Sequence, residues 1–431
     1  MKINNQREKR LTADLEHFRP RMWKISLPGR HYTVRLEDMI PALAGVIGKI
    51  SLTAAFAVAW AEGYQIESAT FVAENVRLEV VIASVTLLLF SVFFHMRLAP
   101  QGTLAPMISL VPVMAAAGVH PLALGILFGL MTITLSVLKG FSRLVSLNDR
   151  GTSAGILILF GLMGVRGSIS SLWNWTQREA DFVFLMLLLS GGCLLCWFLY
   201  RYRQSWLMIP SVLAFGLIFS FINGFIPSFQ TTPGFPLLNA HTWWETRWQI
   251  DASLNMSGWF RAAPFAVLAV LMLPLDASAI QTMQRRQYGP YFSKVSFKLD
   301  PTFFAVGLRH LIGVFFGGAQ IGAVWRSFLI PLGVVRRPIP GSAFLLGIFC
   351  LIFAFAGYPI DLAMYPPLLH LVLVFGVFTP MLVTGWQTAI NKADRVIIVI
   401  CVLGGYFLHP LVGWGLGLLS GRWLKRMIPE T

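Results

Sequence analysis

The stretch that decides the fold is Gly317-Gly-Ala-Gln-Ile-Gly-Ala-Val-Trp-Arg-Ser327, which lies between two strongly apolar segments. Its glycines and extended-looking residues predict irregular backbone at membrane depth, where such backbone persists only if it is buried in protein or lines a cavity. The stretch ends in Arg326, and an arginine in a lipid-embedded segment costs roughly 3 kcal/mol unless it faces a partner or a cavity. Together these features predict half of a binding site for an anion.

The composition is that of a helical membrane protein with many spans. Of 431 residues, 56% are hydrophobic and only 12% are charged, which excludes an ordinary soluble domain. The net charge of +15 comes from lysines and arginines that flank apolar runs, so it favours positive-inside orientation and not nucleic-acid binding. The four cysteines lie within apolar runs, where we interpret them as small apolar side chains, and no metal or cofactor is expected.

Apolar runs divide the chain into two sets of seven, and most runs are long enough to cross a hydrocarbon layer of about 30 Å. The first set occupies residues 36–226 and the second occupies 258–427. A basic arm, 1–35, precedes them, an extracytoplasmic linker with several tryptophans, 227–257, joins them, and a short tail, 428–431, follows. The sequence therefore predicts an all-α polytopic membrane protein with fourteen transmembrane segments.

The charges of the loops support this count. With the N-terminus inside, every predicted cytoplasmic loop is basic, whereas the outer loops carry acids such as Glu62 and Asp361. Both termini are then cytoplasmic. Because seven is odd, the second set runs opposite to the first, which is an inverted-topology repeat. In such transporters the site lies at mid-membrane between short, interrupted segments, here the third and tenth spans around Pro106 and Pro331.

In the second half, a short helix is expected to begin near Ala323, with its N-terminus at the membrane centre. The unpaired N–H groups and the positive end of such a helix attract anions. Arg326 in the first turn adds a full charge and a fork of donors suited to oxyanions, and Ser327 adds a hydroxyl. The alternative is that Arg326 reaches the interface or only bridges the two halves.

Four other polar residues complete the predicted site. Gln101 and Thr103 precede or begin the matching half-helix, where they would donate to an anion or a water, although Thr103 could equally be an ordinary cap. Asp276, the one acid in the apolar body of its span, is the natural partner of Arg326 and either holds it or takes up a transported proton. Lys49, in the first run, faces the cavity or reaches the interface.

No enzyme is expected, because the chain contains no Ser/His/Asp set, no paired catalytic carboxylates and no Gly-x-Ser-x-Gly nucleophile elbow. Arg309 and His310 lie in the middle of the ninth run. We interpret both as side chains that pack between spans.

Several motifs resemble the sulfate permease (SulP) anion transporters, most strongly over about 273–345. Leu275-Asp-Ala-Ser-Ala-Ile280 is similar to the acidic motif of that family's eighth span, with aspartate where glutamate is usual. Part of the first half, around 100–112 and 148–162, resembles a pattern shared with the nucleobase–ascorbate permeases. The ninth and tenth spans carry the resemblance in Asp300-Pro-Thr-Phe-Phe, in Gly313-Val-Phe-Phe-Gly-Gly-Ala-Gln-Ile-Gly-Ala-Val-Trp-Arg-Ser327 and in Gly333-Val-Val-Arg-Arg-Pro338.

The resemblance implies a core domain that moves against a gate domain, a homodimer, and a site between the third and tenth half-helices. It also indicates a divergent member, because the STAS domain typical of sulfate permeases is not expected. Nucleobase permeases resemble that shorter layout but usually place a glutamate where Arg326 stands, and the arginine favours an anion.

The sequence thus predicts a secondary transporter of a small sulfate-, bicarbonate- or carboxylate-like anion that works by alternating access. We expect it in the plasma membrane, most simply a bacterial inner membrane, and coupled to H⁺ or Na⁺, with Asp276 and Lys49 as candidate coupling residues. The alternative is a proton-coupled nucleobase permease of the same fold, with Asp276 as the hydrogen-bonding carboxylate. A channel or a membrane sensor is the third interpretation.

Overall fold

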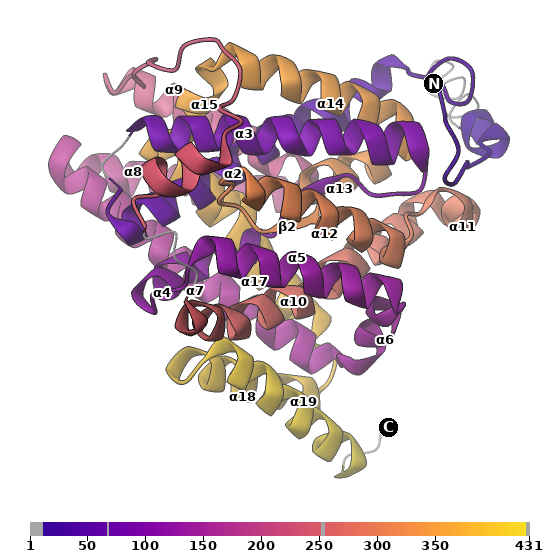
Figure 1. Cartoon of the computed structure of the whole chain (residues 1–431). Coiled ribbons are helices and arrows are strands. Elements are labelled where there is room, and N and C mark those ends of the chain that lie inside the picture. Colours follow the sequence, from indigo (N-terminus) through magenta and orange to yellow (C-terminus); the bar gives the residue numbers. More distant parts are fainter. Residues whose placement is uncertain (1–11, 67–68, 251–254, 428–431) are drawn as a thin grey trace.

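The computed structural model describes residues 12–66, 69–250 and 255–427, and it is built almost entirely of helices (Figure 1). The predicted helical architecture is therefore confirmed, with one short strand pair in addition. Within the described residues, eight helices are long and apolar enough to cross a membrane, and shorter apolar helices accompany them, so the count of fourteen spans stays a prediction. The eight are Leu36–Tyr64, Thr70–Phe94, Arg150–Glu179, Phe182–Arg201, Ser205–Ile222, Met256–Val295, Ile339–Ala356 and Pro366–Thr388.

Each half contains one short strand, with helices before it and a short helix directly after it. In the first half they are η1 (Leu36–Asp38), α2 (Met39–Tyr64), α3 (Ala69–Leu87), η2 (Leu88–Phe94), β1 (Gln101–Thr103), η3 (Ala105–Leu110), α4 (Val111–Ala116), α5 (Pro121–Val137), α6 (Gly140–Leu147), α7 (Arg150–Glu179), α8 (Phe182–Arg201), η4 (Ser205–Leu207) and α9 (Met208–Ile222). The linker contains η5 (Thr242–Arg247). The second half contains α10 (Met256–Tyr288), η6 (Gly289–Tyr291), α11 (Phe292–Val295), α12 (Leu299–Phe315), β2 (Gly322–Val324), α13 (Arg326–Val335), α14 (Ile339–Ala356), α15 (Tyr358–Met364), α16 (Pro366–Leu371), η7 (Val372–Phe378), α17 (Thr379–Thr388), α18 (Lys392–Phe407) and α19 (Pro410–Met427).

Polar residues in the short loops set where several long helices begin. Asp149, Asp181 and Asn391 each accept a hydrogen bond from a backbone N–H of the first turn, at the starts of α7, α8 and α18. A side-chain cap of this kind stabilises a helix by about 1 kcal/mol. The apolar runs between such caps then continue as helices, because inside a membrane the backbone must satisfy its own hydrogen bonds.

The two interrupted segments meet in the centre of the molecule. Strands β1 and β2 pair antiparallel, with Gly102 opposite Ala323, and a short helix follows each strand: η3 with α4 in the first half and α13 in the second. The half-helix of the second half begins at Arg326 and not near Ala323, so that expectation was wrong. The reason is that the backbone of residues 322–324 forms hydrogen bonds with β1, so these residues are not part of the helix.

The helices form two packed groups. One contains α2, α3, α5, α10, α12, α13 and α14, which pack on one another around the strand pair and the main hydrophobic core. The other contains α7, α8, α9, η7 and α17, with a smaller core that includes Leu172, Phe184 and Phe375, and α18 and α19 pack against α7. Helices α18 and α19 project at the lower end of Figure 1.

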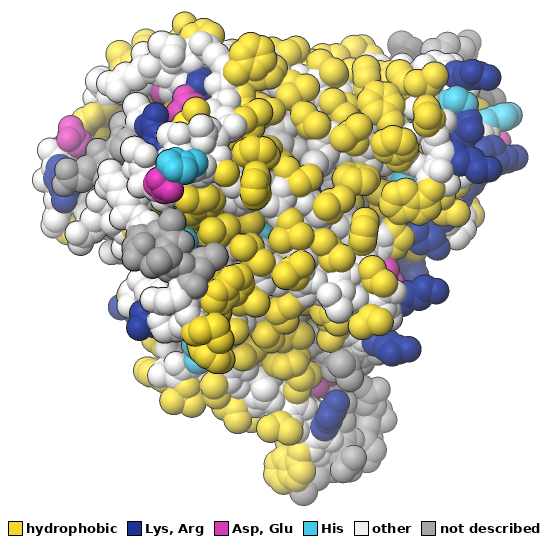
Figure 2. All heavy atoms as spheres, in the orientation of Figure 1, with side chains coloured by type: hydrophobic (Ala, Val, Ile, Leu, Met, Phe, Trp, Pro, Cys, Tyr) yellow, Lys and Arg dark blue, Asp and Glu magenta, His cyan; other side chains and the backbone are white. Residues whose placement is uncertain are grey.

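The surface suits a lipid environment. Hydrophobic side chains cover most of the face shown in Figure 2, while Lys and Arg gather along the edge near α6 and α11. This basic edge is the side that the loop charges assign to the cytoplasm.

The N-terminal arm is tied to this basic edge. In the short helix at residues 12–17, Asp14 accepts a hydrogen bond from Arg35 Nε at 2.6 Å and forms an ion pair with Arg337. Arg337 lies two residues after the end of α13 and also contacts Asp38 at 3.0 Å. The arm is thus linked to the end of the half-helix that starts at Arg326.

Candidate functional site

A cavity of about 420 Å³ lies in front of the half-helix α13. Apolar residues such as Leu52, Pro106 and Met208 form much of its wall, which is typical of small-molecule sites with a few placed polar groups. One side comes from α2, α10 and α13 and the other from α9 and α17. The polar and charged lining residues include Lys49, Thr103, Ser205, Asp276, Thr282, Arg286, Arg326, Ser327, Thr384 and Gln387.

Arg326 is the first residue of α13, and a third of its side chain (33%) is exposed to the cavity side. Trp325, which precedes it, provides no side-chain cap. The positive end of α13 and the guanidinium of Arg326 therefore act at the same place, where an anion would receive donors from both. Ser327, next in the chain, also lines the cavity.

Asp276 is the partner that the sequence suggested for Arg326. Nη1 of Arg326 donates to Oδ1 of Asp276 at 3.2 Å, and the carboxylate side chain is 14% exposed. Only one of the three guanidinium nitrogens is used in this contact, so the pair orients the arginine and leaves donors for a ligand. Both residues line the cavity.

Lys49 and Thr103 reach the cavity from α2 and β1. The ammonium of Lys49 donates to Thr103 Oγ1 at 3.2 Å and to Gln320 Oε1 at 2.8 Å, and it lies 5.4 Å from the centre of the Trp325 ring. The side chain is 1% exposed, so Lys49 does not extend to the membrane interface. Thr103 donates its own proton to Gln320 Oε1 at 2.6 Å.

Gln101 and Ala323 lie in the strand pair and do not line the cavity. Both side chains are fully buried, and Gln101 donates to the carbonyl of Ala99 at 3.3 Å. Their backbone, through the pairing of β1 with β2, fixes where the neighbouring half-helices start. Direct contact of Gln101 or Ala323 with a substrate stays a prediction, and neither side chain faces the cavity in this structure.

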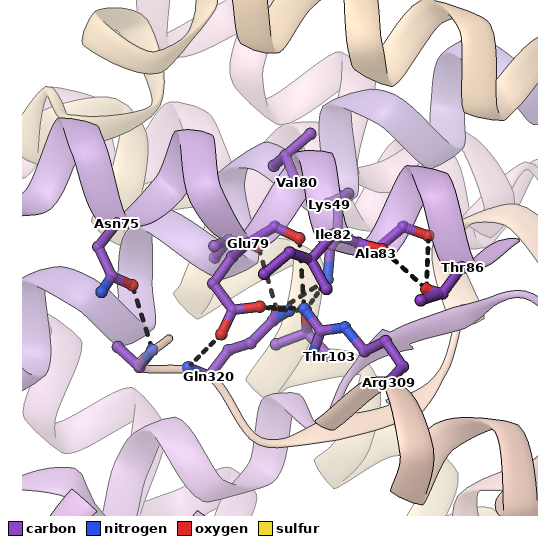
Figure 3. A network of polar contacts seen from close by, with 12 residues as sticks. Lys49, Asn75, Glu79, Val80, Ile82, Ala83, Thr86, Thr103, Arg309 and Gln320 are labelled. Carbon is purple, nitrogen blue, oxygen red and sulfur yellow. Dashed lines mark hydrogen bonds and ion pairs between the residues drawn. The ribbon is translucent and has the colours of Figure 1, made fainter. Parts of the chain in front are cut away.

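A buried ionic network behind the cavity was not predicted (Figure 3). Arg309, which is completely buried, forms an ion pair with Glu79 from α3. Gln320 donates through Nε2 to the same carboxylate at 2.6 Å and through its backbone N–H at 3.4 Å. Because Gln320 also accepts from Lys49, the network runs from the cavity into the core of the first helix group.

The sequence held one signal for this network. Arg309 was interpreted as packing between spans, and this was incomplete, because a buried arginine needs a carboxylate partner at the same depth. Glu79 stands at the second position of its apolar run, and it was not predicted as the partner. His310, the residue after Arg309, does pack between spans, with its ring centre 4.7 Å from that of Phe128.

Side chains from three places hold the glycine-rich stretch that leads to β2. Asn75 Nδ2 donates to the carbonyl of Gly317 at 2.8 Å, and Trp248 Nε1 from the linker donates to the same carbonyl at 3.0 Å. Trp60 Nε1 donates to the carbonyl of Ala319 at 2.9 Å. Gly317 has a φ of +86°, a conformation that strongly favours glycine, and a Cβ at this position would overlap the side chain of Trp243.

The fold is that of known membrane transporters. SLC26A9 aligns with a TM-score of 0.60 and 13% identity over 91% of this chain and 65% of its own length, so the chain spans about two thirds of that protein. The transmembrane domain of the cyanobacterium bicarbonate transporter BicA aligns with a TM-score of 0.60 and 13% identity over 89% of this chain and 96% of that domain. The murine anion transporter Slc26a9 in its inward-facing state aligns with a TM-score of 0.59, 13% identity, 91% of this chain and 69% of its own.

These structures define the class as a multi-pass membrane protein with the transmembrane fold of the SulP/SLC26 anion transporters, so the resemblance found in the sequence is confirmed for the fold. The particular family follows from the sequence itself. The model of the family described as "Protein of unknown function (DUF3360)" matches residues 3–423, and the chain belongs to that family. No curated protein matches the chain.

Proposed function

We propose that this protein is a secondary transporter of a small anion, which binds in the cavity in front of α13. The observation that carries the proposal is Arg326, which lies in the first turn of a half-helix and lines the cavity together with Ser327. A helix N-terminus attracts an anion by about 0.3–2 kcal/mol, and a charge-assisted hydrogen bond adds about 1.5–3 kcal/mol. Thr103 and Ser327 would orient the bound anion.

Alternating access would come from relative motion of the two helix groups. The cavity has one wall from α2, α10 and α13 and the other from α9 and α17, so a shift between the groups would open it to one side at a time. We assign the first group to a core domain and the second to a gate domain. Fourteen spans in a seven-plus-seven inverted repeat complete this proposal, which the strand pair and its two half-helices support.

The similar structures support an anion as the substrate. One is a bicarbonate transporter and another an anion transporter, and neither is an enzyme, in line with the absence of enzymatic activity expected here. Bicarbonate-like, sulfate-like and small carboxylate anions each suit an arginine with a helix N-terminus. Uptake would be coupled to H⁺ or Na⁺, with Asp276 as the candidate proton acceptor. The transporter would be a homodimer in a bacterial inner membrane, with both termini in the cytoplasm.

Radiolabelled anion uptake into proteoliposomes tests the proposal. The wild-type protein is expected to take up bicarbonate, formate or sulfate, and Arg326→Ala to lose that uptake. Arg395→Ala is the matched control, since Arg395 is exposed on α18, lies over the ring of Trp386 and is not one of the residues that line the cavity. Uptake that continues at the full rate in Arg326→Ala would contradict the assignment of this site.

A nucleobase permease is the second candidate, because Asp276 lines the cavity and could hydrogen-bond a ring N–H. The ion pair that Asp276 forms with Arg326 argues against this role, because the carboxylate is already occupied. A thermal-shift panel separates the two candidates: anions should stabilise the purified protein, while stabilisation by uracil or xanthine alone would favour the permease.

A further inference from the structure

We propose that Lys49 supplies a second positive charge to the anion site, and that this uncompensated charge makes the cavity select a monovalent anion. The inference rests on the proposed function and narrows its substrate class. It depends on where Lys49 lies, on its charge, and on how the other buried charges are paired.

Lys49 lies beside the anion-binding turn of α13. It lines the same cavity as Arg326 and Ser327. Gly48, the residue before it, touches Ser327 so closely that a Cβ at this position would overlap the hydroxyl. Helix α2 is therefore pressed against the start of α13, and an anion at that start lies within reach of both cationic side chains.

The surroundings of Lys49 fit an ammonium ion. Its described partners are two oxygen acceptors, from Gln320 and Thr103, and the face of the Trp325 ring. The hydroxyl of Thr103 gives its own hydrogen to Gln320, so its oxygen lone pair faces the lysine. Three acceptors around one nitrogen match the three donors of a charged lysine, and the aromatic face favours a cation.

The other charges next to Lys49, in the cavity wall and directly behind it, are already paired. Glu79 contacts Arg309, and Asp276 contacts Arg326. Among the described residues, Lys49 has no carboxylate at ion-pair distance, and Gln320 stands between its ammonium and Glu79. One positive charge is thus left over at the cavity wall.

This leftover charge decides which anion is bound most favourably. A monovalent anion between Lys49 and Arg326 would bring the site to neutrality. A divalent anion would leave one negative charge in a poorly solvated cavity, and an uncompensated charge in such a place is strongly unfavourable. Arg286, the other cation of the lining, is exposed, and its charge is screened by solvent.

Competition binding to the purified full-length protein tests the inference, with formate and nitrate as monovalent probes and sulfate and oxalate as divalent ones. The wild-type protein should bind a monovalent probe at least about tenfold more tightly than a divalent one. Lys49→Gln should weaken the monovalent probe by roughly 10- to 100-fold, the effect of one charge-assisted contact. The exposed Lys392→Gln is the matched control and should bind as the wild type does.

Two further variants separate the charge effect from misfolding. Asp276→Asn leaves one more positive charge and should shift preference toward divalent probes, and Lys49→Gln/Asp276→Asn should return preference to monovalent probes. Wild-type preference for divalent anions, or unchanged monovalent binding in Lys49→Gln, would overturn the inference while leaving the proposed function intact. If neither probe class binds and Arg326→Ala changes nothing, the proposed function itself fails.

Discussion

At the scale of the residue, the binding site depends on pairs of charges that are buried to different degrees. Arg326 and Asp276 are partly exposed to the cavity, whereas Arg309 and Glu79 are almost completely buried. A partly exposed pair can exchange one partner for a ligand, while a dry pair cannot be broken without a large cost. The first pair therefore suits substrate binding and the second suits structural support.

Replacement of Asp276 tests its role in coupling. In Asp276→Asn the side chain keeps its shape but can no longer gain and lose a proton. We expect an inward proton gradient to stop accelerating anion uptake, while exchange of labelled for unlabelled anion continues. Asp276→Glu is the control and should retain the response. Full acceleration in the asparagine variant would show that the proton is carried elsewhere.

Replacement of Glu79 tests the buried pair. Glu79→Gln leaves the charge of Arg309 without its partner, which should lower the free energy of unfolding by about 3–5 kcal/mol. Glu245→Gln is the matched control, since Glu245 pairs with His241 at an exposed position and its loss should cost about 0–1 kcal/mol. Denaturant unfolding in detergent measures both, and equal losses would contradict the assigned difference.

At the scale of the element, the interrupted segment could be predicted and its surroundings could not. Glycines followed by Arg326 indicated irregular backbone and then a short helix, because each residue type has its own local preference. The start of that helix was misplaced, since residues 322–324 pair with a strand more than two hundred positions earlier. The link of Gln320 to Glu79 depends on the same long-range packing, which local patterns do not encode.

The close contact of α2 with α13 gives a prediction at this scale. Gly48→Ala would push its Cβ into Ser327, which should cost about 1–3 kcal/mol of stability and weaken anion binding. Gly167→Ala is the matched control, because a Cβ there meets nothing within 4 Å and alanine favours a helix. Thermal unfolding with and without anion measures both effects. A stable Gly48→Ala variant with normal binding would show that the two helices need not touch.

The N-terminal arm should loosen in acid. Burial raises the pKa of Asp14, but the hydrogen bond from Arg35 and the charges of Arg337 and Arg35 outweigh it, so the pKa lies below its ordinary value. A carboxyl with a lowered folded-state pKa contributes its full stabilisation above about pH 4 and loses it as the pH falls through the folded pKa. The protection of residues 12–17 against hydrogen exchange, relative to the intrinsic rate at each pH, should therefore fall only below about pH 4. In Asp14→Asn this protection should be low already at pH 7.

At the scale of the whole molecule, the apolar runs were enough to predict a polytopic helical protein, and the inward orientation of its basic side stays a prediction. The chain shares its fold with transporters at 13% identity, because one apolar side chain in a membrane helix can often replace another. The sequence could not indicate which helices form each of the two packed groups. That assignment rests on contacts such as those of α5 with α12 and of α7 with α18.

Density for a bound anion tests the central claim most directly. A structure determined with a heavy monovalent anion, such as iodide or bromate at saturating concentration, should contain one peak in the cavity, about 3 Å from the guanidinium of Arg326 and from the first turn of α13. The same peak should be absent in Arg326→Ala. An anion bound elsewhere, or an empty cavity in a protein that still transports the same anion, would contradict the assignment of this site.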